Sequence, residues 1–166
     1  QPDGIVYHGK SACAYKGDFK ANETIKDGTV VVADGLFYGD EELTSIDIAD
    51  SVEYIGSMAF EECINLREVK LPKSLYTICE ETFYGCESLE SITLPDVVNI
   101  GESAFAHCIS LKNIVIPESV EFGIDDSAFL NCTSLQKVTL NGNIQQIGSA
   151  VLRNSENLRS INIPQR

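Results

Sequence analysis

The sequence has few of the residues and few of the motifs on which most enzyme active sites depend. It contains only two histidines, His8 and His107, and it lacks the G-x-S-x-G and H-E-x-x-H motifs. No C-x-x-C pair is present among its six cysteines, so their spacing indicates neither a zinc site nor a redox pair. We therefore expect a protein that is not an enzyme and that carries no cofactor.

Basic residues and long apolar runs are scarce as well. The chain has 12 Lys and Arg against 25 Asp and Glu, which gives a formal net charge of −13. A charge of that sign argues against nucleic acid and anionic membrane surfaces as partners, because both are negative. No apolar run approaches the roughly 18 residues of a membrane helix, so we expect no membrane insertion. The polar start Gln1-Pro2-Asp3-Gly4 has no signal-peptide pattern, which does not assign the protein to the cytoplasm, because mature secreted proteins have lost that segment.

The sequence does contain one motif that is repeated six times. Phenylalanines recur at intervals of 22 to 24 residues, and a small residue and then a leucine follow each of them at steps of three. A period of this length is typical of a repeat protein whose units stack on one another. The three columns are Phe37, Phe60, Phe83, Phe105, Phe129 and Leu152; Asp40, Cys63, Cys86, Cys108, Cys132 and Ser155; and Leu43, Leu66, Leu89, Leu111, Leu135 and Leu158.

A short strand is expected after the leucine of each unit. Two aliphatic residues lie two positions apart there, as Ile114 and Ile116 do, so both point to one face of a strand. Stacked units then form a parallel sheet with strands about 4.8 Å apart. The phenylalanine, cysteine and leucine columns line the interior between this sheet and the opposite wall. A proline ends the strand in four units, at Pro72, Pro95, Pro117 and Pro164.

The predicted fold is a repeat solenoid, mainly β with short helical or turn segments, in which six units of about 23 residues occupy positions 36–166. The first 35 residues differ, because segments 5–7, 13–15 and 29–32 indicate short strands separated by glycine turns. Repeat arrays need an atypical terminal unit to cover the end of their core. We therefore expect residues 1–35 to form an N-terminal β cap in one continuous domain with the array.

Four of the cysteines, Cys63, Cys86, Cys108 and Cys132, belong to the repeat. Neighbouring members would lie about 4.8 Å apart, within the Cα range of a disulfide. Side chains in one column point the same way, however, which leaves their Cβ atoms too far apart to be bridged. Free cysteine behaves as a small buried hydrophobe. We therefore predict reduced, buried and unreactive thiols.

The repeat resembles that of the BspA-like leucine-rich-repeat family. The likeness lies in units such as Ile55-Gly56-Ser57-Met58-Ala59-Phe60-Glu61-Glu62-Cys63-Ile64-Asn65-Leu66, and it covers roughly residues 36–164. The resemblance implies a right-handed solenoid and a secreted or cell-surface protein, mostly bacterial, with adhesion to extracellular proteins described for some members. It implies no catalytic residues, because the shared positions are core positions.

Departures from the family unit are confined to a few positions. The residue that follows the last isoleucine between units, a position that we call the corner, is glycine in most units but is Cys79 and Asp125 in two of them. Gly123 marks a one-residue insertion, and Val151-Leu152 replaces Ala-Phe. The presence of cysteine in a glycine position suggests that these corners need close packing more than a positive φ.

The outward positions of the predicted strands form the candidate binding surface. Together with the column before them they hold five basic and three acidic residues, on a molecule whose net charge is −13. Extended solenoid sheets serve as binding surfaces, although short polar side chains also pack well side by side without any ligand. The partner-binding candidates are Arg67, Glu68, Lys70, Ser91, Thr93, Lys112, Asn113, Val115, Lys137, Thr139, Arg159, Ser160 and Asn162.

Two further groups of side chains are candidates for binding. Glu80, Glu102 and Asp126 share one column, where a calcium ion could bridge their carboxylates or where they simply face water. Exposed aromatic side chains could anchor a partner or be ordinary surface residues. Tyr38 and Tyr84 share one column, and the wall opposite the strands carries Tyr54, Tyr76 and Phe122.

These features favour an extracellular or cell-surface module that binds a protein or a glycan. The alternative is a structural spacer, or a piece of a longer repeat array, without a ligand of its own. The chain stops at Gln165-Arg166 directly after a strand, so we expect the last unit to dock on another chain or on further repeats.

Overall fold

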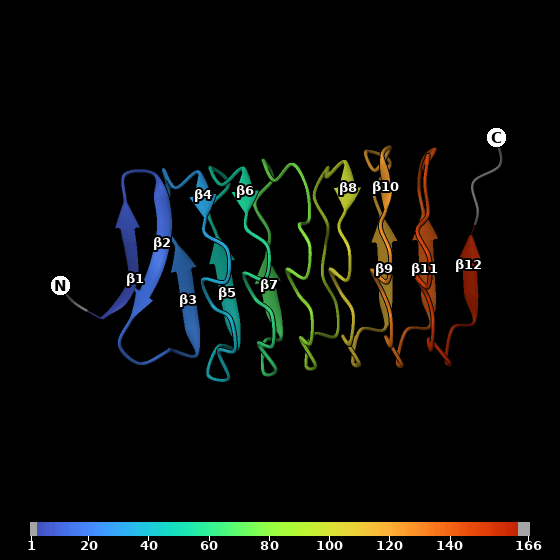
Figure 1. Ribbon diagram of the computed structural model, residues 1–166, viewed down its shortest axis with the longest axis horizontal. Helices are drawn as coiled ribbons and strands as arrows, with labels where there is room; N and C mark the ends of the chain where they lie inside the picture. The colour runs from blue at the N-terminus through green and yellow to red at the C-terminus, as the bar shows by residue number, and fades with distance from the viewer. Residues whose placement is uncertain (1–2, 163–166) are drawn as a thin grey trace.

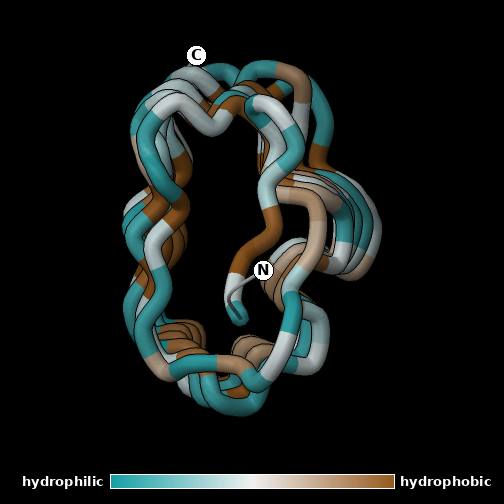
Figure 2. The backbone as a smooth tube through the Cα atoms, turned by 90° about the vertical axis from the view of Figure 1, so that its left-hand side faces the viewer, coloured by the Kyte–Doolittle hydropathy of each residue, from teal (hydrophilic) through white to brown (hydrophobic). Residues whose placement is uncertain are grey.

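The computed structural model describes residues 3–162 as an elongated stack of about seven turns of chain. The polypeptide enters at one end of the stack and leaves at the other, with strands in two rows along its length (Figure 1). Viewed along the stack, the turns superpose as one flattened loop in which hydrophobic residues recur at the same places (Figure 2). The predicted repeat solenoid is confirmed, whereas the expected docking end falls partly on residues 163–166, outside the described residues.

We call each turn of the chain a rung and name it after its phenylalanine, or after Leu152 in the last one. The long strands of the rungs form one wall as two separate parallel sheets. Each strand pairs with its counterpart one repeat away, as Ile46 does with Val69 and Val138 does with Ile161. The first sheet contains β3 (Asn22–Ile25), β5 (Ser45–Ile48) and β7 (Glu68–Lys70), and the second contains β9 (Asn113–Ile116), β11 (Lys137–Leu140) and β12 (Ser160–Asn162).

A second row of two-residue strands forms the short-strand wall on the other side of the core. It consists of β4 (Val31–Val32), β6 (Tyr54–Ile55), β8 (Asn99–Ile100) and β10 (Gly123–Ile124). Single bridges continue the β8–β10 row on either side, from Ile78 to Ile100 and from Ile124 to Ile147. These isoleucines are the apolar corner residues of the repeat, and all but Ile147 are buried.

The N-terminal end is closed by an antiparallel hairpin of β1 (Gly4–His8) and β2 (Ser11–Lys16). Strand β2 pairs in parallel with β4, and the ring of Tyr15 lies 5.8 Å from that of Phe37, so the hairpin covers the first phenylalanine. The strands expected near 5–7, 13–15 and 29–32 are present. Strand β3 was not predicted from the sequence, and it pairs with β5 as the first member of the long-strand wall.

The phenylalanines form a continuous stack through the middle of the solenoid. Their ring centroids are 5.3–5.4 Å apart and the ring planes are within 12° of parallel. All five side chains are at most 1% exposed. The spacing is close to the rise of about 4.8 Å between parallel strands, so identical rings stack on one another from rung to rung.

The segments around the phenylalanines form a third wall, which we call the turn wall. In each rung, three backbone N–H groups of this wall donate hydrogen bonds to carbonyls of the following rung. They belong to the phenylalanine, to the residue two positions before it and to the residue two positions after it. All five junctions from the Phe37 rung to the Leu152 rung carry all three hydrogen bonds, with N···O distances of 2.7–3.1 Å. The turn wall therefore continues without interruption along the array.

Two residues of every turn-wall segment adopt a left-handed backbone conformation, with φ between 53° and 68°. This conformation costs a non-glycine residue about 1–2 kcal/mol, and it places the N–H groups along the stack. The segments predicted as short helical or turn segments are therefore turns. The described residues contain no helix, and hence none that could cross a membrane. The left-handed residues are Gly35, Gly39, Met58, Glu62, Glu81, Gly85, Ser103, His107, Ser127, Asn131, Ala150 and Asn154.

The column of four cysteines lies inside the turn wall, fully buried and without disulfides, as predicted. Each thiol donates to the carbonyl of the phenylalanine one rung earlier, as Cys63 Sγ does to Phe37 O at 3.0 Å and Cys108 Sγ does to Phe83 O at 3.2 Å. Burial raises the pKa of Cys63 to about 12, so the thiol stays protonated and keeps its role as donor. Cysteine is thus more than a small hydrophobe here, because it supplies a hydrogen bond that alanine could not.

Candidate functional site

The predicted partner-binding residues lie together on the outer side of the long-strand wall. We call this surface the strand face; it comprises the outward side chains of β3, β5, β7, β9, β11 and β12, of residues 90–93, and of the residue that precedes each of these strands. The inward-pointing aliphatic residues are buried in β5, β9 and β11, and all of the candidates named above are exposed except Thr139, which is half-buried. The alternation predicted from the sequence is therefore confirmed, and the structure brings the candidate residues onto one continuous surface.

Two of the five basic side chains on the strand face are already paired with acids of the preceding rung. Lys70 Nζ lies 3.3 Å from Asp47 Oδ1, and Lys112 Nζ donates to Glu90 Oε2 at 2.6 Å. The Lys112 ammonium lowers the pKa of the Glu90 carboxyl. These exposed pairs contribute little to stability, but they neutralise part of the surface. Within residues 3–162 no ion pair involves the other three bases, which are Arg67, Lys137 and Arg159.

The strand face is hollowed over its N-terminal half. One hollow of about 320 Å³ crosses β3, β5 and β7, and a second of about 290 Å³ lies between β7 and residues 91–93. Both hollows are lined by Glu68 and Lys70, so they adjoin each other. The strand face therefore offers a polar depression at one end, lined in part by Arg67, and two basic side chains that are unpaired within the described range, Lys137 and Arg159, towards the other.

The second hollow lies where the sheet of the strand face is interrupted. Residues 91–94, which carry Ser91 and Thr93, form no strand and pair in register with neither β7 nor β9. Lys112 N donates to Glu90 O at 3.1 Å, and the described residues show no backbone hydrogen bond between segments 67–71 and 90–94. The sequence repeat gave no sign of this break, because the Phe83 unit has the same aliphatic pattern as its neighbours.

The acidic column proposed as a cation site is present but is not arranged around an ion. Glu80, Glu102 and Asp126 are exposed residues of successive rungs. Asp126 Oδ1 accepts a hydrogen bond from the backbone N–H of Ser149 at 2.6 Å. In the described part of the chain no three His, Cys, Asp or Glu side chains are placed to hold a metal ion together. The arrangement gives no support to a bridging cation.

The carboxylate of Asp40 was not identified from the sequence as a buried ionisable group. Asp40 occupies the first position of the cysteine column and is fully buried. Its Oδ1 accepts from the backbone N–H groups of Glu42 and Leu43, both at 2.9 Å, while Oδ2 has no hydrogen-bond partner. Burial raises the pKa of this carboxyl. Asp40 caps the turn in the way that aspartate commonly does, so its role is structural.

The rung architecture and the exposed strand face define a leucine-rich-repeat protein. A family model described as "BspA type Leucine rich repeat region (6 copies)" matches residues 30–159. Because this range is most of the chain, the protein belongs to the BspA-type leucine-rich-repeat family. A search of curated proteins finds no significant match.

Three solved structures of bacterial proteins share the fold. A leucine-rich repeat protein from Bacteroides ovatus ATCC 8483 has a TM-score of 0.78 and 25% identity, over 99% of this chain and 53% of that one. A leucine-rich cell surface protein from Faecalibacterium prausnitzii A2-165 has a TM-score of 0.75 and 23% identity, over 95% and 52%. The pneumococcal vaccine antigen PcpA has a TM-score of 0.69 and 25% identity, over 82% and 34%. The chain thus spans about half the length of the first two proteins and about a third of the last.

Proposed function

We propose that the protein is a non-enzymatic, extracellular or cell-surface module that binds a protein or a glycan through its strand face. The observation that carries the proposal is the charge distribution. Arg67, Lys137 and Arg159 are exposed and unpaired among the described residues, on a molecule with a net charge of −13. A surface of this kind attracts acidic groups of a partner, and the adjoining hollows offer room for side chains or sugar rings.

A location outside the cell is supported by the family and by one of the similar structures. PcpA is described as a vaccine antigen, a use that requires access for antibodies. The buried cysteines are compatible with an oxidising environment, because a protonated, inaccessible thiol is neither a nucleophile nor easily oxidised.

The proposal is tested by screening the protein against immobilised extracellular matrix proteins and a glycan array. The strand-face variant Lys137→Glu/Arg159→Glu is compared with Lys10→Glu/Lys73→Glu, which changes the net charge equally at positions away from the strand face. We expect the first variant to bind any ligand found in the screen about tenfold more weakly, and the second to bind like the wild type. Equal binding by both variants would remove the strand face as the site.

The alternative function is that of a spacer within a longer repeat array. It is favoured by one observation, namely that the chain spans only about half of the length of the first similar structure. A spacer would bind nothing in the screen, and it would tolerate charge reversal on the strand face without any loss of function in the longer protein.

A further inference from the structure

We propose that the short-strand wall is a second binding surface, and that its partner is a basic polypeptide segment rich in lysine or arginine. This surface lies on the opposite side of the core from the strand face, so it is independent of the function proposed above. Its central feature is a column of exposed aromatic and aliphatic side chains, Tyr76, Val98 and Phe122, bordered by acids.

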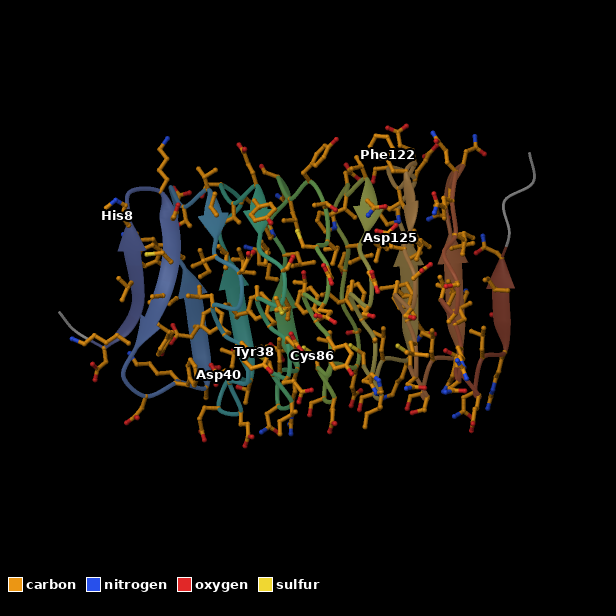
Figure 3. All side chains as sticks on the ribbon, viewed as in Figure 1. His8, Tyr38, Asp40, Cys86, Phe122 and Asp125 are labelled. Atoms are coloured by element: carbon orange, nitrogen blue, oxygen red, sulfur yellow. The ribbon has the colours of Figure 1, made fainter. Side chains whose placement is uncertain are left out.

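Backbone hydrogen bonds place the three side chains on successive rungs. Val98 N donates to Tyr76 O at 3.0 Å, and Phe122 N donates to Val98 O at 3.2 Å. Tyr76 is 62% exposed and Phe122 is 53% exposed, while Val98 between them is half-buried. Figure 3 shows Phe122 at the edge of the stack opposite to Tyr38 and Asp40. The two rings thus stand two rungs apart, a separation of about 10 Å at the usual strand spacing.

The two later rungs of this column are acidic. Residues 95–103 contain two acidic residues and residues 117–127 contain four, and neither segment contains a lysine or an arginine. Asp96, Glu118 and Glu121 are exposed, and within the described chain none of them forms an ion pair. The first rung contains one basic residue, Lys73, three positions before Tyr76, and its Nζ is paired with Asp50 Oδ2 at 3.7 Å. The carboxylates are therefore available to an external cation.

Aromatic rings among carboxylates match the chemistry of a cationic side chain. An ammonium or guanidinium group binds over the face of a Tyr or Phe ring, and nearby carboxylates add charge attraction. The apolar stem of a lysine or arginine would lie against Val98 between the two rings. An anionic partner would be repelled, and a neutral glycan would leave the acids without a role. Charge complementarity therefore selects a basic polypeptide.

The ring spacing also suggests the form of the bound segment. Two cations that reach Tyr76 and Phe122 together must be about 10 Å apart. In a polyproline II helix, which rises 3.1 Å per residue with three residues per turn, residues i and i+3 lie about 9 Å apart on one side. A synthetic peptide with the sequence Lys-Pro-Pro-Lys-Pro-Pro-Lys is therefore a suitable probe.

The experiment measures binding of this peptide by fluorescence anisotropy at low and high salt. The variant Tyr76→Leu/Phe122→Leu keeps the apolar surface but removes the rings, and Tyr38→Leu is a matched change of an exposed tyrosine on the turn wall. We expect the double variant to bind roughly tenfold more weakly, from two exposed cation–π contacts, and Tyr38→Leu to bind like the wild type. Equal affinities for all three proteins would overturn the proposal.

A second pair of variants separates this surface from the overall charge. Asp96→Asn/Glu118→Gln/Glu121→Gln neutralises acids beside the aromatic column, and Glu41→Gln/Glu42→Gln/Glu87→Gln neutralises three elsewhere. We expect weaker binding and a reduced salt dependence only for the first. Equal losses in both, or binding of a neutral hexasaccharide with no binding of the peptide, would also overturn the proposal. If a triple or double variant fails to melt like the wild type, Phe122→Leu alone is used and a loss of at least threefold is expected.

Discussion

The turn wall and the strand face of this solenoid differ in how completely their backbones are bonded. Every junction along the turn wall carries the same three hydrogen bonds, and the four junctions from Phe37 to Phe129 also share the same ring contact. The sheet of the strand face is divided in two, with residues 91–94 in neither part. The Phe60 and Phe83 rungs therefore stay stacked at 5.4 Å on one side while they separate on the other. Continuity of the array depends on the turn wall, which leaves the strand face free to open and to vary.

Cys79 lies at the same junction between rungs but on the short-strand wall, where a second interruption occurs. In the corner column, glycine or its replacement donates its N–H to the previous corner, as Gly101 does to Ile78 O at 2.8 Å and Gly148 does to Ile124 O at 2.7 Å. A Cβ added at Gly101 would lie 2.8 Å from Cys79 C, so the corner has no space for a side chain. Cys79 has one, and among the described residues its N–H makes no such bond to Ile55 O.

The other replacement, Asp125, is accommodated differently. It keeps its hydrogen bond to Ile100 O at 2.9 Å, and its unit contains the inserted residue Gly123. The two replacements therefore differ: the unit of Asp125 has an inserted residue and keeps the corner hydrogen bond, whereas in the described structure the unit of Cys79 has neither. The structure also confirms that the corner glycines are required for close packing, because Gly56, Gly101 and Gly148 do not have positive φ.

The largest expected effect comes from removing a ring of the stack. Phe83→Ala leaves a cavity beneath a continuously bonded wall that cannot collapse, so we expect a loss of about 3–5 kcal/mol in the free energy of unfolding. Val69→Ala, on the half-buried edge of the break, should cost only about 1 kcal/mol. Urea unfolding followed by circular dichroism measures both. Similar losses would show that the two walls contribute equally.

The buried thiols make the turn wall sensitive to alkali. Burial raises the pKa of Cys63 and Cys132 to about 12 from an ordinary 9.0, so above pH 9 the unfolded chain loses protons that the folded chain retains. The stabilisation is complete below that pH and is lost as the pH rises towards 12, by roughly 1–2 kcal/mol per thiol at pH 10. Melting temperatures from pH 7 to 11 test this. Cys63→Ala/Cys132→Ala should flatten the decline, whereas Cys13→Ala, at an exposed position, should not alter it.

The left-handed positions of the turn wall should show a smaller effect. Gly39 has φ of 68°, and a Cβ at this position would meet no atom within 4 Å, so Gly39→Ala tests backbone strain without a clash. We expect it to cost about 1 kcal/mol, whereas Thr93→Ala in the break should change the free energy of unfolding by less than about 0.5 kcal/mol. Chemical denaturation of the two variants provides the measurement, and an equal response would contradict the assignment of strain to the turn wall.

The smallest effect concerns local opening rather than global stability. Amide hydrogens of residues 90–94 should exchange faster than those of β9 and β11, because they lack partners in the sheet. Cys79→Gly should slow this exchange by allowing the junction to close, with little change in melting temperature. Mass-spectrometric hydrogen exchange of the two proteins would show it. An unchanged exchange rate in the variant would mean that Cys79 does not cause the break.

Much of the core and of the candidate surface could be predicted from the sequence. Phe60 and Leu66 are buried and Lys137 is exposed, as their columns indicate, because a period of 22 to 24 residues superposes equivalent positions in a stack. The strand β3 escaped prediction because Asn22–Ile25 lacks the leucine and phenylalanine of the motif, and it is recruited by pairing with β5. The unpartnered Oδ2 of Asp40 likewise depends on packing that no local pattern reports.

From the sequence alone it follows that six similar units stack, which side chains point inwards, and that the acids outnumber the bases on most of the surface. These properties follow from periodicity and composition, which act in the same way in every rung. Periodicity and composition could not show that the turns are left-handed loops rather than helices, that Lys70 and Lys112 are paired while Lys137 is not, or that the sheet of the strand face is divided at residues 91–94. Each of these depends on how one rung meets the next, where a single Cβ or a neighbouring carboxylate changes the outcome.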